Sequence, residues 1–140
     1  MRNWMTWVLI AAVVGASSFA CASSTAPAGN PVDVVVVPLT GALLIPAATV
    51  AAHQVTLTGA LGAPDPCYTF RATATRVRET LQVRLIGTGS AQACITVLGQ
   101  FRYTVTLRDV PPGEWTIDLS LEIPDSRISD RLFRGVVRVE

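Results

Sequence analysis

Apolar and polar residues alternate along most of the chain after residue 31, and this pattern constrains the fold more than any other feature. Alternation places apolar side chains on one face of an extended strand and polar side chains on the other. From residue 32 onward, no run shows the 3.6-residue apolar stripe of a capped helix, so a helical domain is not expected. The clearest alternating runs cover residues 68–75, 81–85, 101–108 and 115–122.

Further strands are predicted for Val32–Val37, Thr49–Thr58 and Leu132–Val139. Residues 40–48 are expected to form a loop or a bent edge, and residues 59–66, with two glycines and two prolines, a connection. About seven short strands with one polar face each predict an all-β, antiparallel sandwich of the immunoglobulin or fibronectin kind. A parallel sheet is not expected, because its strands are usually apolar on both faces.

Residues 1–22 have the composition of a secretory signal segment. Arg2 supplies the basic start, and residues 4–16 form an uncharged apolar run that is short for a bilayer span of about 20 residues. A retained membrane anchor is the alternative. Two cleavage sites compete: one after Ala22, and one directly before Cys21, which would then carry a lipid.

The three cysteines bear on this choice. Two of them, Cys67 and Cys94, fall in the folded part and can pair, which leaves Cys21 where a lipid-modified cysteine would stand. The residues before Cys21 match a lipobox poorly, and cleavage after Ala22 would also leave an even number. We expect a lipid-anchored protein on the periplasmic or outer surface of a membrane, with a freely secreted protein as the alternative.

The chain after the signal segment divides into a spacer and one domain. Residues 22–31 are small, polar or Pro/Gly and are expected to form a flexible tether. Residues 32–140 then form a single domain.

A bridge between Cys67 and Cys94 would close a loop of about 28 residues and stabilise the domain by about 3.5 kcal/mol in the chain-entropy model. It would tie the open end of a hairpin-like unit rather than pin two sheets together. A redox-active pair usually has closer spacing, and a zinc site needs about four ligands where the domain offers two cysteines and His53. No metal or cofactor is therefore expected.

Several short segments together resemble a known group of proteins. They are Pro66-Cys67-Tyr68, Ala93-Cys94, Phe101 with its alternating Val and Thr residues, and Pro112-Gly113-Glu114-Trp115-Thr116. Over about Asp65–Leu121, the chain resembles small exported bacterial proteins, often lipoproteins, with an immunoglobulin-like sandwich. The resemblance implies a fold and a compartment, and it supplies no catalytic residues.

A search for catalytic groups yields little. His53 is the only histidine and is expected to be a partly exposed strand residue rather than a catalytic one. The acidic residues are scattered singly, and Asp125 and Asp130 lack the spacing of a calcium loop. Trp115 is expected in the core. The formal net charge is only +1, which argues against a nucleic-acid partner.

Three outward-facing arginines, Arg71, Arg84 and Arg102, would form a basic stripe if their strands were neighbours in one sheet. Such a stripe could contact an anionic surface such as phospholipid headgroups or an acidic glycan. The alternative is an ordinary solubilising face.

The expected function is that of a non-enzymatic, exported envelope domain with an interaction or structural role, whose partner is an envelope protein or a glycan. The alternative is an inhibitor or accessory module of an extracytoplasmic hydrolase. Its contacts would come from the loops predicted at residues 60–66 or 87–92.

Overall fold

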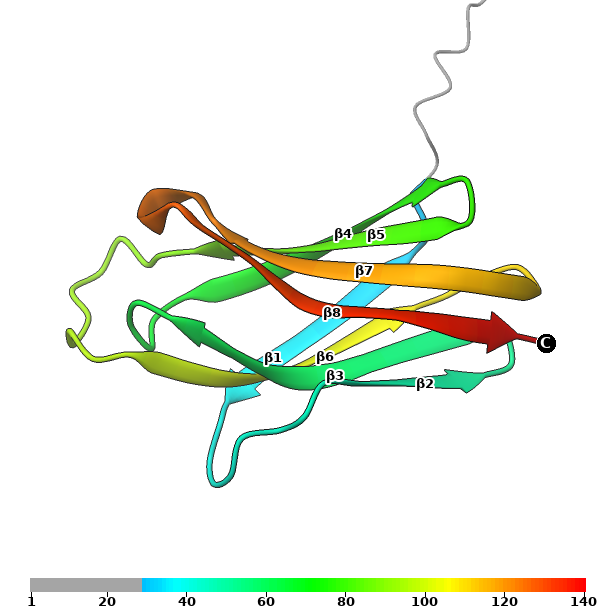
Figure 1. Cartoon of the computed structure of the whole chain (residues 1–140). Helices are drawn as coiled ribbons and strands as arrows, with labels where there is room; N and C mark the ends of the chain where they lie inside the picture. The colour runs from blue at the N-terminus through cyan, green and yellow to red at the C-terminus, as the bar shows by residue number, and fades with distance from the viewer. Residues whose placement is uncertain (1–28) are drawn as a thin grey trace, which may run out of the picture.

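The computed structural model describes residues 29–140, which fold into two four-stranded sheets packed face to face (Figure 1). The all-β sandwich predicted from the sequence is confirmed, with eight strands instead of about seven. Among the described residues, the only helical element is one 3-10 turn, η1. In chain order the elements are β1 (Val32–Pro38), β2 (Ala47–Ala51), β3 (Gln54–Ala63), β4 (Thr69–Val77), β5 (Thr80–Thr88), β6 (Gly99–Leu107), β7 (Gly113–Ile123), η1 (Pro124–Ser126) and β8 (Ile128–Val139).

The strand order is β1-β6-β3-β2 in one sheet, here sheet A, and β4-β5-β7-β8 in the other, sheet B. Every neighbouring pair is antiparallel except β5 and β7, which are parallel. After β5 the chain crosses to sheet A, runs back along β6 and returns, so β7 enters sheet B in the same direction as β5. The purely antiparallel arrangement expected from the alternation therefore fails at this central pair.

The core lies between the sheets and includes most of the residues that the alternation assigned to inward faces, together with Leu61 and Ala63 from the predicted connection and Val110. On β5, Leu81, Val83 and Leu85 are fully buried, and β6 and β7 bury their inward residues in the same way. Trp115 is 4% exposed, as expected for a core residue. Its indole Nε1–H donates to the carbonyl oxygen of Pro111 at 2.8 Å, which satisfies the polar end of the ring.

The single strand predicted for Thr49–Thr58 is in fact a hairpin of β2 and β3. Ala52 turns the chain with a positive φ of 48°, a conformation that glycine or asparagine usually adopts. No turn-forming residue marks this position, so the sequence reads as continuous. His53 lies in this turn, exposed to solvent, and not within a strand as predicted.

The connection predicted for residues 59–66 is also partly wrong, because residues 59–63 continue β3. Gly59 is the register partner of Tyr103 on β6, and a Cβ at position 59 would overlap the Tyr103 ring. This glycine makes room for a large side chain instead of marking a turn. The true connection between the sheets is residues 64–68.

Residues 29–31 are held against the sandwich at the end opposite the disulfide. The side-chain amide of Asn30 donates to the carbonyl oxygen of Arg108 at 3.3 Å. The backbone amide of Arg108 donates to the carbonyl oxygen of Pro31 at 2.9 Å. The predicted signal segment, Cys21 and the tether as far as residue 28 lie outside the described residues. Within residues 29–140, no helix is long and apolar enough to cross a membrane.

Candidate functional site: an uncharged face, an apolar tip and an edge groove

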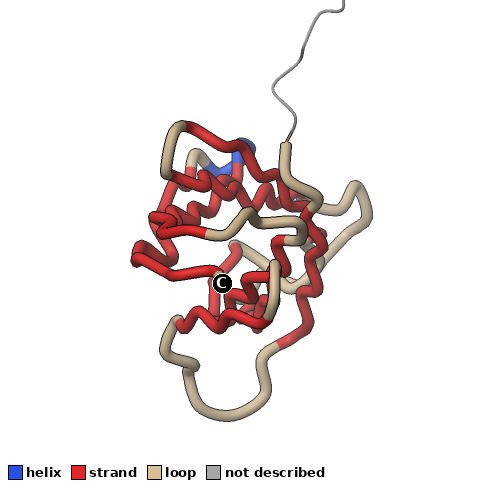
Figure 2. Tube along the Cα trace, turned by 90° about the vertical axis from the view of Figure 1, so that its right-hand side faces the viewer, coloured by secondary structure: helices blue, strands red, loops and turns tan. Residues whose placement is uncertain are grey.

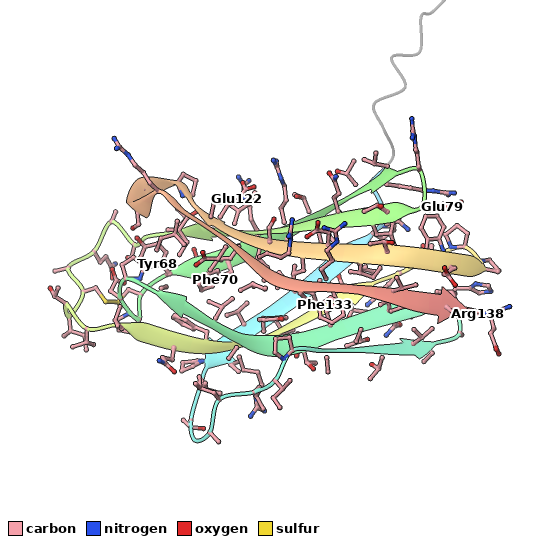
Figure 3. The ribbon with its side chains drawn as sticks, viewed as in Figure 1. Tyr68, Phe70, Glu79, Glu122, Phe133 and Arg138 are labelled. Atoms are coloured by element: carbon pink, nitrogen blue, oxygen red, sulfur yellow. A yellow bond between two sulfur atoms is a disulfide. The ribbon has the colours of Figure 1, made fainter. Side chains whose placement is uncertain are left out.

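Cys67 and Cys94 form a disulfide with an S–S distance of 2.04 Å, as the sequence predicted. Figure 3 draws it as a yellow bond at the end of the sandwich where Tyr68 is labelled. Cys67 lies in the segment that connects β3 to β4, and Cys94 in the one that connects β5 to β6. Both segments cross between the sheets, and the bridge closes the open end of the β4–β5 hairpin, where Thr69 and Thr88 are register partners.

A carboxylate lies beside this bridge. The Cys67 amide donates to Oδ1 of Asp65 at 2.9 Å. Ligand atoms of Asp65, Cys67 and Cys94 lie within 4.8 Å of one another, but the two sulfur atoms are bonded to each other and supply no thiolate. This cluster therefore does not form a metal site while the bridge is intact.

The segment directly after Cys94 exposes three large aliphatic side chains. Ile95, Val97 and Leu98 are 66%, 53% and 80% exposed, and we refer to them as the apolar tip. The Val97 amide donates to the carbonyl oxygen of Ile95 at 3.0 Å, and the disulfide anchors the segment at Cys94. The exposed Leu43, from the β1–β2 loop, lines a separate small hollow with Gly62 and Gln100. Figure 2, which views the sandwich from one end, shows long loops extending beyond the two layers.

The two sheets differ sharply in charge. The strands of sheet A carry only two charged residues, Asp33 and Arg102, and Asp33 is paired with Arg108 at 2.5 Å. The strands of sheet B carry ten: Arg71, Arg76, Arg84, Glu114, Asp118, Glu122, Asp130, Arg131, Arg134 and Arg138. The sandwich thus has one charged face and one nearly uncharged face of Thr, Val and Ala.

The predicted stripe of Arg71, Arg84 and Arg102 does not exist as one surface. Arg71 and Arg84 lie on neighbouring strands of sheet B, whereas Arg102 lies on β6 in sheet A. Arg84 is moreover paired with Glu122 at 3.2 Å. Alternation shows which face of its own strand a residue occupies, but not which sheet the strand joins, so the sequence could not separate the three.

A polar hollow of about 350 Å³ lies on the outer face of sheet B, where β7 and β8 lose register beside Ser120. It is lined mainly by charged and polar residues, among them Asp118, Glu122 and Arg131. Arg131 Nε lies 3.0 Å from Asp118 Oδ1, and Glu122 is paired with Arg84. Each of these carboxylates is thus already compensated by an arginine. No sequence pattern indicated the hollow, because strand pairing assembles it from widely separated residues.

His53 lines a separate hollow of about 270 Å³ with Arg108 and Asp109. The lining residues are Ala51, Ala52, His53, Gln54, Arg108 and Asp109, and none of them is a Ser, Thr or Cys. Among the residues that line this hollow, His53 therefore finds no hydroxyl or thiol nucleophile that it could activate.

The edge of sheet A at β1 faces a groove of about 390 Å³ between the two sheets. The groove is lined by Val34–Val36 of β1, by Thr69 and Phe70 of β4 at the edge of sheet B, and by Tyr68, which precedes β4. Phe70 packs edge-on against Phe101, with their ring centroids 5.2 Å apart. The inward valines of β1 and Phe70 are only half-buried, whereas the inward residues of the central strands are fully buried. The core is consequently less well covered along this groove than between the central strands.

Comparison with known proteins adds to the fold assignment. The family model of the ORF11 beta-sandwich domain matches residues 55–120, which extend from the start of β3 to most of β7. No curated protein and no solved structure matches this chain. Over residues 55–120, the chain is therefore similar to the ORF11 beta-sandwich domain, in agreement with its two-sheet structure.

Proposed function

We propose that this protein is a non-enzymatic, exported envelope domain that binds a partner protein through the apolar tip. The N-terminal segment acts as a signal, and Cys21 anchors the mature chain to a membrane through its lipid. Lipid chains contribute about 0.8 kcal/mol of membrane affinity per buried CH₂ group, so this anchor would keep the domain at the membrane surface.

The observation that carries the proposal is the placement of three exposed aliphatic residues on a segment anchored by a disulfide, at the end opposite residue 29. A domain tethered at its N-terminal end would present the tip away from its anchor. From Leu85 to Phe101, the chain contains no charged residue, so a partner can cover the tip without desolvating a charge. Exposed apolar residues that gather on one part of a surface mark interaction sites.

A protein partner suits the tip better than a glycan. Sugar rings usually stack on exposed aromatic side chains, whereas the tip offers only Ile, Val and Leu. The buried Trp115 is not available for such stacking.

The anchor is tested by mass spectrometry of the processed N-terminus, purified from membrane fractions of the native host. Diacylated or triacylated Cys21 supports the anchor. An unmodified N-terminus at Ser23 would show a freely secreted protein, and a retained leader would show a membrane span.

The tip is tested by placing a photo-crosslinking amino acid at Leu98 and, as a control, at Thr73 on sheet B. We expect one discrete crosslinked product from Leu98 and none from Thr73. The same product should disappear when Ile95 and Val97 are both replaced by Ser. A product that persists in this variant, or that forms equally from Thr73, contradicts the proposal.

A second candidate is an inhibitor or accessory module of an extracytoplasmic hydrolase. The observation that favours it is the same disulfide, because a covalently held loop can enter an active site with little loss of conformational entropy. The segment at residues 87–92 remains a loop apart from the end of β5, whereas residues 60–63 belong to β3. A panel of secreted hydrolases decides: dose-dependent inhibition of one member supports this role, and inertness throughout supports the first.

A further inference from the structure

The disulfide and the carboxylate beside it form a three-residue cluster whose chemistry changes when the bridge opens (Figure 3). One ligand atom from each of Asp65, Cys67 and Cys94 lies within 4.8 Å of the other two, and all three residues are half-buried. In the oxidised protein the two sulfur atoms are bonded to each other and bind no metal. Reduction would turn them into two thiols, whose thiolate forms bind soft metal ions.

The carboxylate is held in place by contacts that do not involve the bridge. Oδ1 of Asp65 accepts the backbone N–H of Cys67 at 2.9 Å, and this bond does not use the second oxygen, Oδ2. The Asp65 backbone is also closely packed, because a Cβ at Gly99 would lie 2.5 Å from its carbonyl oxygen. Carboxylates that bind metals are commonly oriented by such hydrogen bonds. Asp65 is therefore expected to stay beside the two sulfurs after they separate.

We propose that Asp65, Cys67 and Cys94 bind one Zn²⁺ ion when the disulfide is reduced, with a water molecule as the fourth ligand. Tetrahedral zinc with Zn–S bonds of about 2.3 Å places its two sulfur ligands about 3.8 Å apart. The two Cα atoms are 6.1 Å apart, so rotations about the Cα–Cβ bonds can supply this separation. Thiolates favour zinc over Ca²⁺ and Mg²⁺, which prefer oxygen ligands. The sequence offered only His53 as a third ligand, and His53 lies in the β2–β3 turn, at the other end of β3.

Opening the bridge needs a two-electron reductant, such as a protein dithiol. One thiolate of the dithiol attacks a bridge sulfur, and its second sulfur then closes a disulfide within the dithiol and releases the chain. The bridge gains two electrons and two protons in this exchange, and zinc binding then displaces the two thiol protons. Zinc is therefore bound where the compartment is reducing, and the covalent bridge persists where it is oxidising.

The zinc ion would link the same two segments as the disulfide. Asp65 and Cys67 belong to the connection between β3 and β4, and Cys94 belongs to the connection between β5 and β6. An ion that binds the folded chain and not the unfolded chain stabilises the fold. A site with three protein ligands binds zinc less tightly than a closed site with four. We therefore expect a dissociation constant on the order of 0.1–1 µM at pH 7.

The first test is a titration with Co²⁺, a spectroscopic substitute for Zn²⁺, on protein that has been purified from its exporting host and reduced by a phosphine. The phosphine takes an oxygen atom from water and becomes its oxide, while the bridge gains two electrons and two protons. We expect thiolate-to-cobalt charge-transfer absorption in the reduced protein and none in the oxidised protein. Added Zn²⁺ should remove this absorption, and the competition gives the zinc dissociation constant. A reduced protein without this absorption, or an oxidised protein with equal absorption, overturns the proposal.

The third ligand is tested by Asp65→Asn. The asparagine keeps an oxygen that can accept the Cys67 N–H but loses the carboxylate, so the zinc dissociation constant should rise at least about 10-fold. Asp125→Asn is the matched control, because it removes the same charge from η1, at the end of the sandwich where Tyr68 bonds Ser126. It should change the constant by no more than about 3-fold. An unchanged constant in Asp65→Asn, or an equal rise in Asp125→Asn, contradicts the carboxylate ligand.

A second measurement shows whether the ion is bound by the folded domain. Urea unfolding of the reduced protein should move to a higher urea concentration when Zn²⁺ replaces a chelator, and Asp65→Asn should show a smaller shift. If reduction alone unfolds the domain, Zn²⁺ should restore its β-sheet circular dichroism. Zinc that binds without either effect is held by thiols of an unfolded chain, which overturns the proposal.

Discussion

Gly59 on β3 lies directly opposite Tyr103 on β6, and the space that a Cβ would occupy at position 59 is filled by the Tyr103 ring. The ring is fully buried, so it has little room to move away. We therefore expect Gly59→Ala to overpack this site and to reduce the free energy of unfolding by about 1–3 kcal/mol. Urea denaturation followed by far-UV circular dichroism measures the change. Gly62→Ala on the same strand is the matched control, because only the Gly99 carbonyl oxygen lies near a Cβ there, at an ordinary 3.9 Å.

The same tyrosine makes stability depend on alkaline pH. Its hydroxyl is buried without a hydrogen-bond partner, and burial raises the pKa of Tyr103 to about 12. In the unfolded chain this tyrosine would ionise near pH 10, so between about pH 10 and 12 the unfolded state holds fewer protons than the folded state. The free energy of unfolding should therefore fall as the pH rises through this window, by about 2–3 kcal/mol in total.

Tyr103→Phe checks this prediction, because phenylalanine keeps the packing and removes both the ionisation and the unpaired hydroxyl. We expect the variant to be as stable as the parent at pH 7, or more stable by up to about 1 kcal/mol, since no hydrogen bond is lost. Its stability should fall less between about pH 10 and 12. Equal alkaline losses in both proteins would show that Tyr103 is not the group responsible.

The disulfide lies outside the buried core, so it can be removed without disturbing core packing. The two cysteines are 27 residues apart, and the chain-entropy model gives about 3.5 kcal/mol for a loop of this size. We expect the double variant Cys67→Ser, Cys94→Ser to lose about 2–4 kcal/mol and to remain folded at 25 °C. The parent protein measured with and without a reductant should show the same loss. In the native, oxidised protein, neither Cys67 nor Cys94 should react with an alkylating reagent.

The sequence predicted the fold class well because inward residues recur every second position on the central strands. On β6 and β7 the predicted inward residues, such as Tyr103 and Ile117, are fully buried. Periodicity is a local property, and a strand that covers a core must show it. The two wrong boundaries arose where backbone behaviour departs from residue type: Ala52 turns without a glycine, and Gly59 sits inside a strand.

The candidate sites could be predicted only in part. The cysteine pairing followed from counting, because few partners were available. The separation of Arg71 from Arg102 depends on which sheet each strand joins, and local alternation is the same for both sheets. The edge position of β1 likewise depends on the order of strands within sheet A. Strand order is set by contacts between residues far apart in the chain, so a single sequence read locally does not reveal it.

Trp115 and Arg76 allow a test of how the sandwich is closed at the end away from the disulfide. The Arg76 guanidinium lies 4.4 Å from the centroid of the Trp115 ring, and the indole donates to Pro111. We expect Trp115→Phe to cost about 2–3 kcal/mol, because the ring becomes smaller and the Pro111 carbonyl loses its donor. Arg76→Ala should cost about 0.5–1 kcal/mol, the usual range for a cation–π contact at the surface. In the double variant, the two losses should sum to more than the measured total by up to about 0.5–1 kcal/mol, since the phenylalanine ring keeps only part of the contact. Urea denaturation followed by circular dichroism suits all four proteins, because Trp115→Phe removes the only tryptophan of residues 29–140. Strictly additive losses would mean that the guanidinium gains no more from the indole than from the phenyl ring.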